Sequence, residues 1–309
     1  MKYMTVGNEL EGASQLVLGC MRLAEHAPEE VVSVLETALE VGINFFDHSD
    51  VYAGGQSEAK FAQALRSAKI PRDRVLIQSK CGLRDVHTNY HFDFSKDYII
   101  SSVEASLARL QTDYLDVLLL HRPDALVEPE EVAEAFSQLH QAGKVRHFGV
   151  SNQNPYQIEL LQKSVEQPLI ANQLQFGPAH TPMLDAGLNA NMLNPLAIVR
   201  DGSVLDYCRL HHITIQPWSP FQVDLNQGLF MEHPKYAQLT ETLHAFASDY
   251  QVSFEALVLA WILRHPAQMQ PIVGSMNPQR IRSMVAAFDI ELSRADWYKI
   301  YKSAGNPLP

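Results

Sequence analysis

Four residues at or near the ends of short apolar runs have side chains that together could transfer a proton: Asp47, Tyr52, Lys80 and His121. A free phenol has a pKa of about 10. An ammonium group beside it favours the phenolate and lowers that pKa towards the range useful for proton transfer. A buried lysine keeps its charge when a carboxylate such as Asp47 holds it. A neutral histidine can direct a hydrogen bond to a substrate oxygen. The set therefore suits protonation of a carbonyl oxygen while another group attacks the carbon.

That other group should be a hydride donor, because the chain offers no nucleophile for the carbon. Ser151, Asn152 and Gln173 carry hydroxyl and amide groups suited to a carboxamide. Trp218 offers a flat face on which a ring can stack, although a tryptophan is also a common core residue. The sequence thus predicts a place for a hydride donor that carries a carboxamide and a ring.

An anion could bind near the C-terminus of the chain. Ser275 leads into a helix expected to begin at Asn277-Pro278, and a helix N-terminus attracts anions. Arg280 lies one turn into this helix and could hold a phosphate, or could be an ordinary surface charge. Arg122, next to His121, could receive an acidic substrate or form a salt bridge at the rim of the site.

The elements that must position these residues alternate along the chain. Eight short apolar segments are nearly all followed by a helical pattern, which favours parallel βαβ units. Eight such units close into a (β/α)8 TIM barrel, an α/β fold. An open doubly wound sheet is the alternative, but no G-x-G-x-x-G follows the first strand. The expected strands are residues 15–19, 43–47, 75–80, 114–121, 147–151, 170–176, 214–220 and 271–275.

Helix signals between these strands are clear. Pro-Glu-Glu at 28–30 and at 129–131 begins two helices, and Asn154-Pro155 and Asn277-Pro278 cap two more. Residues 1–13 are expected to form a short hairpin or lid, and an amphipathic helical tail should carry Trp297, Ile300 and Tyr301. Further helices are expected near 57–69, 96–110, 199–211 and 235–263, with irregular stretches at 82–94, before 199 and up to about 233. In such a barrel the active site lies at the C-terminal strand ends, where the polar candidates of this chain fall.

Composition narrows the function classes. The chain of 309 residues shows no linker or composition shift, so we expect one domain over residues 1–309. Its net charge of -11 argues against nucleic acid or an anionic membrane as the main partner. Three scattered cysteines indicate a reducing compartment, and no apolar leader or spanning segment is seen. We therefore expect a cytoplasmic protein, either a monomer or a weak homodimer.

Three segments of the chain resemble the aldo-keto reductase family. G-I-N-F-F-D-H-S-D-V-Y at 42–52, followed by Gly-Gly and Ser57-Glu58, resembles the family signature around its Asp and Tyr. L-D-V-L-L-L-H-R-P-D at 115–124 is similar to the strand that carries the family's His, and G-K-V-R-H-F-G-V-S-N at 143–152 to the strand that binds the nicotinamide amide. The similarity spans about residues 15–290. Within the family the chain most resembles the bacterial YdhF-like oxidoreductases.

The resemblance implies an NADPH-dependent oxidoreductase that reduces aldehydes or ketones. It implies Tyr52 as general acid, Lys80 and Asp47 as its tuning pair, and His121 as the residue that orients the substrate. It places Ser151, Asn152 and Gln173 on the carboxamide and Trp218 under the nicotinamide ring. The other cofactor contacts that it implies are Cys20, Met21, Ser219, Phe221 and Gly274, with Ser275 and Arg280 at the adenosine 2′-phosphate.

The chain also departs from the family pattern. Gly274 stands where many members carry Lys, and Met284 where many carry Asn. The segment W-S-P-F-Q-V-D at 218–224 lacks the glycines of the usual Y-S-P-L-G-x-G. These departures concern the preference for NADPH over NADH and not the reaction chemistry.

Two other functions stay open at this point. One is an NADPH-binding regulatory or sensor protein with little turnover. The other is a barrel hydrolase with a metal at Asp47, His48 and Asp50, although no H-E-x-x-H or paired-cysteine motif is present and no metal is expected. The substrate itself is not identified by the sequence. Candidates for the rim of its pocket are Tyr90, His91, Phe176 and Phe221.

Overall fold

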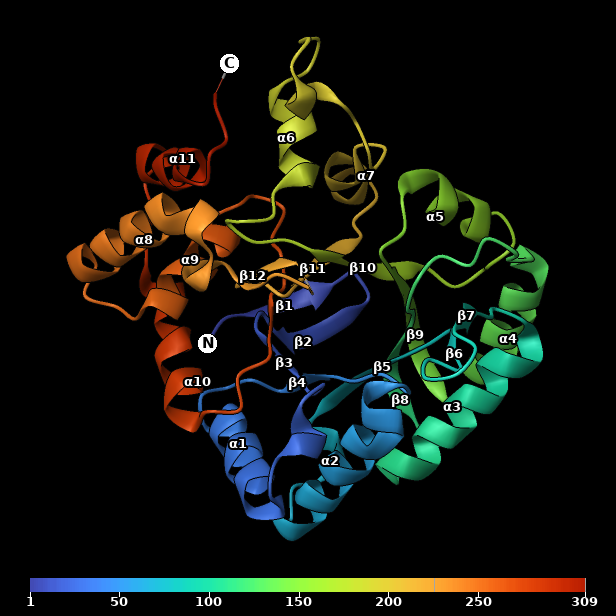
Figure 1. Ribbon diagram of the computed structural model, residues 1–309. Coiled ribbons are helices and arrows are strands. Elements are labelled where there is room, and N and C mark those ends of the chain that lie inside the picture. Colours follow the sequence, from blue (N-terminus) through green and yellow to red (C-terminus); the bar gives the residue numbers. More distant parts are fainter. Residues whose placement is uncertain (225, 309) are drawn as a thin grey trace.

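A barrel of eight parallel strands forms the centre of the computed structural model, which describes residues 1–224 and 226–308 (Figure 1). The strands pair in the order β11-β10-β9-β8-β5-β4-β3-β14. A backbone hydrogen bond of 3.0 Å from Gln270 to Ile215 joins the segment before β14 to β11 and brings the two edges together. The predicted (β/α)8 architecture is confirmed. The strands are β3 (Val17–Gly19), β4 (Phe45–Asp47), β5 (Leu76–Cys81), β8 (Leu115–Leu120), β9 (Val145–Ser151), β10 (Leu169–Gln175), β11 (Thr214–Trp218) and β14 (Ile272–Val273).

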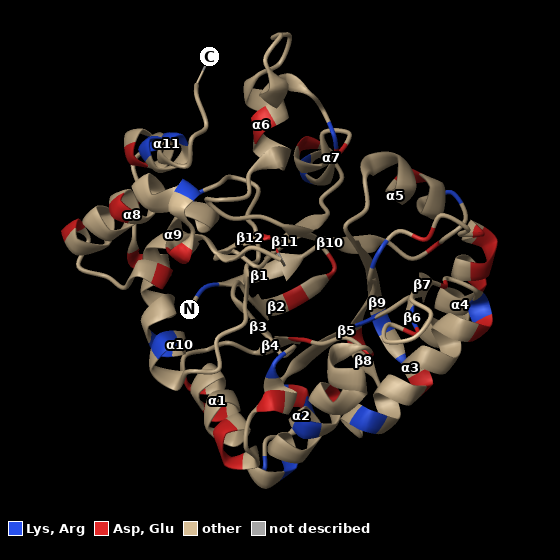
Figure 2. Ribbon diagram, in the orientation of Figure 1, with Lys and Arg blue, Asp and Glu red and all other residues tan. Residues whose placement is uncertain are grey.

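Helices surround this barrel, and Figure 2 shows many of the Lys, Arg, Asp and Glu residues on this outer ring of helices. In α1, Val31, Val34, Leu35 and Ala38 are buried at helical spacing, which fixes the face that packs on the strands. Within the described part of the chain, no helix has the length and apolar character needed to cross a membrane. The helices are α1 (Pro28–Glu40), α2 (Gln56–Ser67), α3 (Lys96–Leu110), α4 (Pro129–Gln141), α5 (Pro155–Gln162), α6 (Pro182–Leu188), α7 (Val204–Leu210), α8 (Ala237–Asp249), α9 (Phe254–Leu263), α10 (Pro278–Met284) and α11 (Arg294–Ser303).

Two predicted caps are confirmed at the C-terminal side of the barrel. The Asn154 side chain accepts a hydrogen bond of 3.1 Å from the Gln157 amide at the start of α5. The Asn277 side chain accepts bonds of 2.9 and 3.2 Å from the amides of Gln279 and Arg280 at the start of α10. Such caps satisfy amide groups that the first helical turn leaves unpaired. α5 begins four residues after the end of β9, and α10 begins five residues after the end of β14.

The N-terminal residues form a hairpin, β1 (Tyr3–Val6) and β2 (Leu10–Ser14), that closes the N-terminal end of the barrel. Its Val6 and Leu10 pack in one buried cluster with Val17 and Phe45, the first residues of β3 and β4. The Gly7 amide donates a hydrogen bond of 3.0 Å to the Thr214 hydroxyl at the start of β11. Of the two options, hairpin or lid, the segment is a hairpin at the end opposite the predicted active site.

The connections contain more regular structure than expected. The stretch between β10 and α7 holds an additional helix, α6, which begins at Pro182 and is anchored by a 2.7 Å hydrogen bond from the Tyr301 hydroxyl to Asp185. The helix expected near 199–211 is shorter than predicted, Val204–Leu210. Two small hairpins also lie within stretches expected to be irregular: β6 (Leu83–Arg84) with β7 (His91–Phe92), and β12 (Gln222–Asp224) with β13 (Gly228–Leu229).

The predicted C-terminal helical tail is α11, which packs on α9. Trp297, Ile300 and Tyr301 are buried, and the Trp297 ring stacks on the Trp261 ring with centroids 4.8 Å apart. Each of these two indoles donates a hydrogen bond to the other residue's backbone carbonyl, at 3.1 and 2.9 Å. The tail is therefore part of the core.

Candidate active site

Lys80 lies at the centre of the polar cluster. Its Nζ donates hydrogen bonds of 2.7 and 2.8 Å to the two carboxylate oxygens of Asp47 and one of 2.6 Å to the His48 carbonyl. A further bond of 3.1 Å reaches the Tyr52 hydroxyl oxygen. Burial alone would lower the pKa of Lys80, but Asp47 and Tyr52 outweigh it and the pKa is raised. The lysine is therefore a buried ammonium in contact with the phenol.

Neighbouring strands bring this pair together. Asp47 is the last residue of β4 and pairs with Gln78 of β5, two residues before Lys80. Residues two apart on a strand point to the same face, so Gln78 and Lys80 both reach Asp47. Gln78 donates a 2.7 Å hydrogen bond to the same Asp47 oxygen that receives one of 3.0 Å from Gln173. The carboxylate is thus held from three sides.

The glutamines continue across the barrel interior, and three of them were not predicted from the sequence. Gln216 and Gln78 exchange hydrogen bonds of 2.9 and 3.1 Å, and Gln216 donates one of 2.9 Å to Gln270. Gln78, Gln216 and Gln270 are fully buried. Their signal in the sequence is a lone amide inside an otherwise apolar strand or next to one, a position where an unpaired polar group would be costly.

Tyr52 begins a short 3-10 turn, Tyr52–Gly55, that leads into α2. Ala53, Gly54 and Gly55 have positive φ angles of 51°, 63° and 85°, and the two glycines adopt them without strain. Burial raises the pKa of Tyr52, and the opposing effect of Lys80 only partly offsets this rise. Our expectation that Lys80 would lower this pKa overall is wrong, because desolvation dominates. Tyr52 therefore stays protonated at neutral pH and has a proton that it can donate.

His121 follows directly after β8 and faces Tyr52, with ring centroids 6.1 Å apart and the planes at 83°. Its Nδ1 lies 3.1 Å from the Ser49 hydroxyl. Burial, with Lys80 and Arg122 nearby, lowers the pKa of His121 well below its ordinary value. The ring is therefore neutral at physiological pH and can offer one N–H and one lone pair. The four residues singled out in the sequence thus lie together.

The residues expected to bind the carboxamide also lie together, but they bond to one another. Ser151 donates a 2.9 Å hydrogen bond to the Gln173 carbonyl, and Asn152 donates one of 2.8 Å to the Ser151 hydroxyl. The Trp218 indole donates one of 3.3 Å to Asn152, whose φ angle is 57°. The Gln173 amide is directed at Asp47. Trp218 is partly buried and does not belong to the buried hydrophobic clusters.

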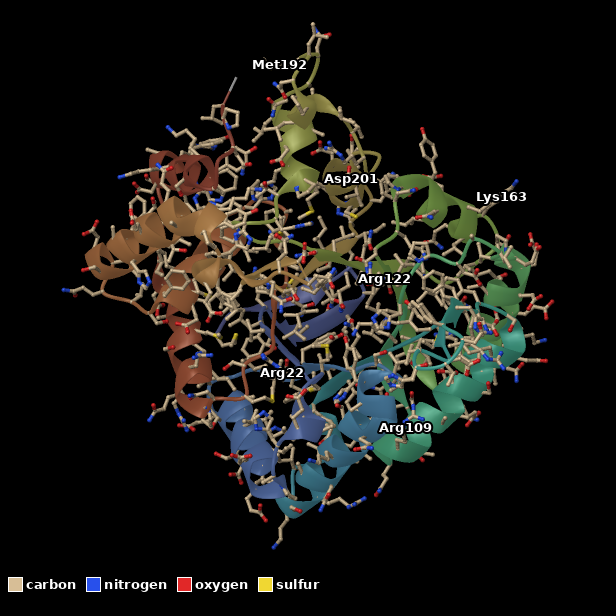
Figure 3. The ribbon with its side chains drawn as sticks, viewed as in Figure 1. Arg22, Arg109, Arg122, Lys163, Met192 and Asp201 are labelled. Carbon is tan, nitrogen blue, oxygen red and sulfur yellow. The ribbon has the colours of Figure 1, made fainter. Side chains whose placement is uncertain are left out.

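A cavity of about 680 Å³ opens beside these residues, and its lining mixes polar residues such as Arg122, Asn152 and Arg200 with apolar ones such as Trp218. The Arg122 guanidinium lies over the Trp218 ring, 5.6 Å from its centroid. Within the described residues no carboxylate stands at ion-pair distance from Arg122, so the alternative of a rim salt bridge is not found. Figure 3 shows Arg122 on the inner side of the ring of helices, whereas Lys163 and Met192 project from its outer edge.

A second cavity, of about 760 Å³, lies at the start of α10. Arg22, Ser275, Arg280 and Arg282 line it, together with two glutamates. Arg280 forms a 3.0 Å ion pair with Glu255 but remains about half exposed. Because the Asn277 cap already occupies two amides of α10, the positive charge of this cavity comes from its arginines. Arg22 also donates a hydrogen bond to the Gly274 carbonyl.

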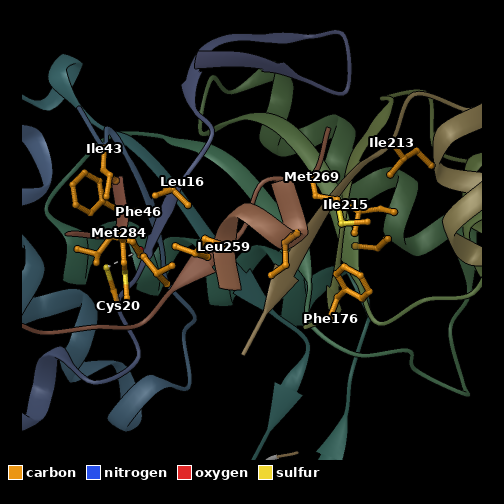
Figure 4. Close-up of a cluster of buried hydrophobic side chains, with 14 of the residues drawn as sticks. Leu16, Cys20, Ile43, Phe46, Phe176, Ile213, Ile215, Leu259, Met269 and Met284 are labelled. Carbon is orange, nitrogen blue, oxygen red and sulfur yellow. Dashed lines mark hydrogen bonds between the residues drawn. The ribbon is translucent and has the colours of Figure 1, made fainter. Parts of the chain in front are cut away.

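Other candidates differ in their access to ligands. Cys20 is fully buried among core side chains such as Phe46, and this burial raises the pKa of its thiol well above the usual value (Figure 4). Its side chain therefore cannot touch a cofactor, and only its backbone could. Met21 is 53% exposed, whereas Ser219 and Phe221 are half-buried.

The candidates for the pocket rim also differ. Phe176 as a rim residue is wrong, because its ring is buried against Trp261 with centroids 5.4 Å apart. Tyr90 and His91 are exposed on and next to the β6–β7 hairpin. The hairpin residues thus remain candidates for substrate contact, and Phe176 belongs to the core.

The metal alternative at Asp47, His48 and Asp50 lacks a ligand geometry. Asp47 is bonded to Lys80, and the His48 ring packs edge-on against Phe61 at 4.5 Å. Burial lowers the pKa of His48 to about 3, so this ring is a neutral core residue. Asp50 faces two serines. In the described part of the chain no three His, Cys, Asp or Glu side chains gather in a way that could hold a metal ion.

Comparison with known proteins places this arrangement in a family. Residues 15–304 match the sequence model of the Aldo/keto reductase family. The chain belongs to this family. It is 38% identical to oxidoreductase YdhF of Escherichia coli (strain K12) over 298 residues, which cover 94% of this chain and 93% of that protein. It is 31% identical to a 6-dehydroglucose reductase of Agrobacterium fabrum, with 98% of each chain covered. The resemblance to YdhF-like oxidoreductases is confirmed.

Solved structures support the fold. A thermostable aldo-keto reductase, Tm1743, crystallised with the inhibitor epalrestat, superposes with a TM-score of 0.78 at 23% identity, over 98% of this chain and 100% of that one. An aldo/keto reductase from Klebsiella pneumoniae in complex with NADP and acetate gives a TM-score of 0.76 at 24% identity, over 100% and 97% of the two chains. This protein is thus an aldo-keto reductase family enzyme, an oxidoreductase acting on carbonyl compounds with a nicotinamide cofactor.

Proposed function

We propose that this protein reduces aldehyde or ketone carbonyls with NADPH, and that Tyr52 is the general acid. The observation that carries the proposal is the contact between the Tyr52 hydroxyl and the Lys80 ammonium at 3.1 Å, with Lys80 itself held by Asp47. A protonated phenol beside a fixed positive charge can lose its proton when charge develops on a neighbouring oxygen.

In the proposed reaction the carbonyl oxygen lies against Tyr52 and His121 and accepts hydrogen bonds from them. When bound, NADPH would supply the hydride for the carbonyl carbon. As the C=O π bond breaks and negative charge gathers on the oxygen, the Tyr52 O–H bond breaks and its proton forms the product hydroxyl. The phenolate that remains is stabilised by Lys80, whose charge Asp47 preserves in the buried site.

The proposed cofactor site extends between the two cavities. The nicotinamide end would lie near Trp218, with Ser151, Asn152 and Gln173 at its carboxamide, and Met21, Ser219, Phe221 and the backbone of Cys20 near the rest of the molecule. The 2′-phosphate would lie at Ser275 and Arg280, near Gly274, where Arg22 and Arg282 add positive charge. NADP in the Klebsiella relative supports this preference for NADPH.

The substrates that we propose are small and polar. The cavity beside Trp218 is lined by Arg122, Arg200, Asn152 and other polar side chains, among them Asp201 and Asp224, which offer hydrogen-bond partners to the hydroxyl groups of a substrate. The 31% identity to a 6-dehydroglucose reductase supports a polar carbonyl compound.

The test is cofactor binding followed by turnover. NADPH is titrated into the protein while tryptophan fluorescence is recorded, and a reactive dicarbonyl is then added while NADPH absorbance is followed. We expect binding and turnover in the natural protein, and in Tyr52→Phe unchanged binding with kcat lowered by at least about a hundredfold. Wild-type turnover in Tyr52→Phe would show that another group is the acid. Tight NADPH binding without turnover would favour the sensor function, and binding of NADH alone would overturn the cofactor preference.

A further inference from the structure

We propose that Ser49 and Asp50 are positioning residues for His121 and determine which of its ring nitrogens carries the proton. The proposal rests on the function proposed above, in which His121 donates a hydrogen bond to the carbonyl oxygen. It is carried by an unbroken chain of short contacts behind the histidine. The Ser49 hydroxyl lies 3.1 Å from His121 Nδ1 and 3.1 Å from an Asp50 carboxyl oxygen, and the Ser102 hydroxyl donates a 2.8 Å hydrogen bond to the other Asp50 oxygen.

Three separate elements hold this series of hydrogen-bonded side chains in place. Ser49 and Asp50 follow β4, and the Asp50 amide donates a 3.1 Å hydrogen bond to the Lys80 carbonyl on β5. Ser102 projects from α3, and Ser49 is fully buried. Because Ser49 occupies Nδ1, the nitrogen of His121 that remains for a substrate oxygen is Nε2.

The protonation state of Asp50 determines the tautomer of His121 through the Ser49 hydroxyl. The Ser49 hydroxyl has a single proton and lies between two partners. When Asp50 is ionised, Ser49 donates to the carboxylate and accepts from Nδ1–H, so Nε2 presents a lone pair. When Asp50 is protonated, its O–H donates to Ser49, Ser49 donates to Nδ1, and Nε2 carries the proton. The state of Asp50 therefore reaches the substrate through one hydroxyl group.

A carbonyl oxygen is an acceptor, so it requires the form of His121 with the proton on Nε2. Keeping that form against an ionised Asp50 means turning Ser49 away from a buried carboxylate, which loses a charge-assisted hydrogen bond. Such a loss disfavours the productive tautomer by about tenfold or more. Reduction should therefore be fastest while Asp50 is protonated.

The surroundings of Asp50 place its titration in an accessible pH range. Burial raises the pKa of Asp50 to about 6, and the bonds from Ser102 and Ser49 only partly offset this effect. The charged and titratable groups that face it are Glu58 on α2, which raises its pKa, Arg109 on α3, which lowers it, and Tyr98 and Cys81. Arg109 also pairs with Glu58 at 2.7 Å, which reduces the effect of both on Asp50. Figure 3 shows Arg109 at α3, on the side of the ring that faces α2.

The decisive variant is Asp50→Asn, whose amide imitates the protonated carboxyl by donating to Ser49 while its oxygen accepts from Ser102. We expect kcat/KM for NADPH-dependent reduction of a dicarbonyl to fall in the natural protein by about tenfold between about pH 5 and pH 8, with a midpoint near Asp50's pKa. In Asp50→Asn the fall should be absent, so that this variant is the faster enzyme at pH 8.

Three further variants separate positioning from a structural role. Ser49→Ala removes the link and should abolish the same pH dependence, whereas Ser49→Thr keeps a hydroxyl and should restore it. Asp97→Asn, an exposed carboxylate on the first turn of α3, is the matched control and should keep the natural profile. An unaltered pH profile in both Asp50→Asn and Ser49→Ala would overturn the proposal.

A spectroscopic measurement tests the same idea without turnover. In protein labelled with ¹⁵N-histidine, the His121 signals are identified by their loss in His121→Asn. We expect the proton to move from Nε2 to Nδ1 as the pH rises through the midpoint, and to stay on Nε2 in Asp50→Asn. A single tautomer throughout would refute the proposal. If the natural protein shows this exchange but reduces no carbonyl at any pH, the control of the His121 tautomer by Ser49 and Asp50 is supported and the proposed function is wrong.

Discussion

Two buried aspartates on barrel strands, Asp47 and Asp116, have opposite surroundings. Asp47 ends β4 at the C-terminal side and is paired with Lys80, which is itself almost fully buried. Asp116 is the second residue of β8, towards the N-terminal side, and is paired at 2.7 and 3.2 Å with Arg72 and Arg146, whose side chains are partly exposed. Both carboxylates are satisfied, but only one of them is connected to a reactive group.

The difference lies in what the partner cations still touch. Arg72 and Arg146 lie over the Tyr114 ring, 4.0 and 3.7 Å from its centroid, and Asp116 also accepts a 2.9 Å hydrogen bond from the Ile77 amide. Every contact there serves to fix strands and loops. Lys80 instead reaches the hydroxyl oxygen of Tyr52, a side chain that is only partly buried. A buried ion pair indicates chemistry when a titratable group that can meet a ligand completes it.

Lys80→Met should give the largest effect, because it damages both activity and stability. Without the ammonium the Tyr52 phenolate loses its stabilisation, and we expect kcat for reduction to fall by at least about a hundredfold. Asp47 would remain as an unpaired buried charge, which costs about 3–5 kcal/mol in the free energy of unfolding. Steady-state kinetics and urea unfolding measure the two losses. Unchanged kcat would separate Lys80 from the chemistry.

Asp116→Ala should affect stability alone. Removing this carboxylate leaves the Ile77 amide and two arginines without their partner, but the arginines can reach water. We therefore expect a loss of about 2–3 kcal/mol in the free energy of unfolding, less than for a fully buried pair. At a temperature where the variant is folded, kcat should stay within about twofold of the natural value. A loss of activity in folded protein would end the contrast between the two aspartates.

Gly7→Ala tests the hairpin that closes the N-terminal end. Gly7 has a φ angle of +58°, and an added Cβ would lie 2.4 Å from the Ile170 Cβ, so the hairpin must shift. We expect a loss of about 1–3 kcal/mol in thermal or urea unfolding, with kcat unchanged.

Gly12→Ala on the same hairpin is the matched control. Its φ angle is +70°, but an added Cβ would meet nothing within 4 Å. It should therefore lose only the conformational part, about 1 kcal/mol. Equal losses in the two variants would show that the contact with Ile170 contributes nothing.

The sequence predicted the barrel well because its signals are local and repeated. Apolar runs that end in polar residues mark the strands, and Asn154 and Asn277 mark helix starts that the structure confirms. The four residues proposed for catalysis could be named because each follows or ends such a run. Predicting that they come together needed only the rule that parallel strands share one active end.

The features that could not be predicted from the sequence depend on contacts between distant segments. Asp116 lies within the apolar run L-D-V-L-L-L, and only the structure shows Arg72 and Arg146 beside it. Gln78 and Gln216 are visible in the sequence only as lone amides, and the structure alone shows that they bond to each other across the barrel. The direction of the Tyr52 pKa shift depends on the balance between burial and Lys80, which no spacing reveals. Helix α6 was missed because its anchor, Tyr301, lies more than a hundred residues away.

Gly274→Lys should give the smallest effect. It tests the C-terminal side of the barrel by adding a contact to the proposed cofactor instead of removing one. An added Cβ at this position would meet only the Arg22 guanidinium, at 3.5 Å, so the backbone tolerates a side chain there. A lysine would place one more positive charge in the cavity that we assign to the 2′-phosphate. We expect the Kd for NADPH to fall by about threefold while the Kd for NADH is unchanged, because a partly exposed ion pair contributes about 0.5–1 kcal/mol. Fluorescence titration with both cofactors measures this, and Gly187→Lys, which adds the same charge to an open position on α6, is the control. If Gly274→Lys lowered the Kd values for NADPH and NADH equally, the 2′-phosphate would bind elsewhere. The same conclusion would follow if Gly187→Lys lowered the Kd for NADPH as much as Gly274→Lys does.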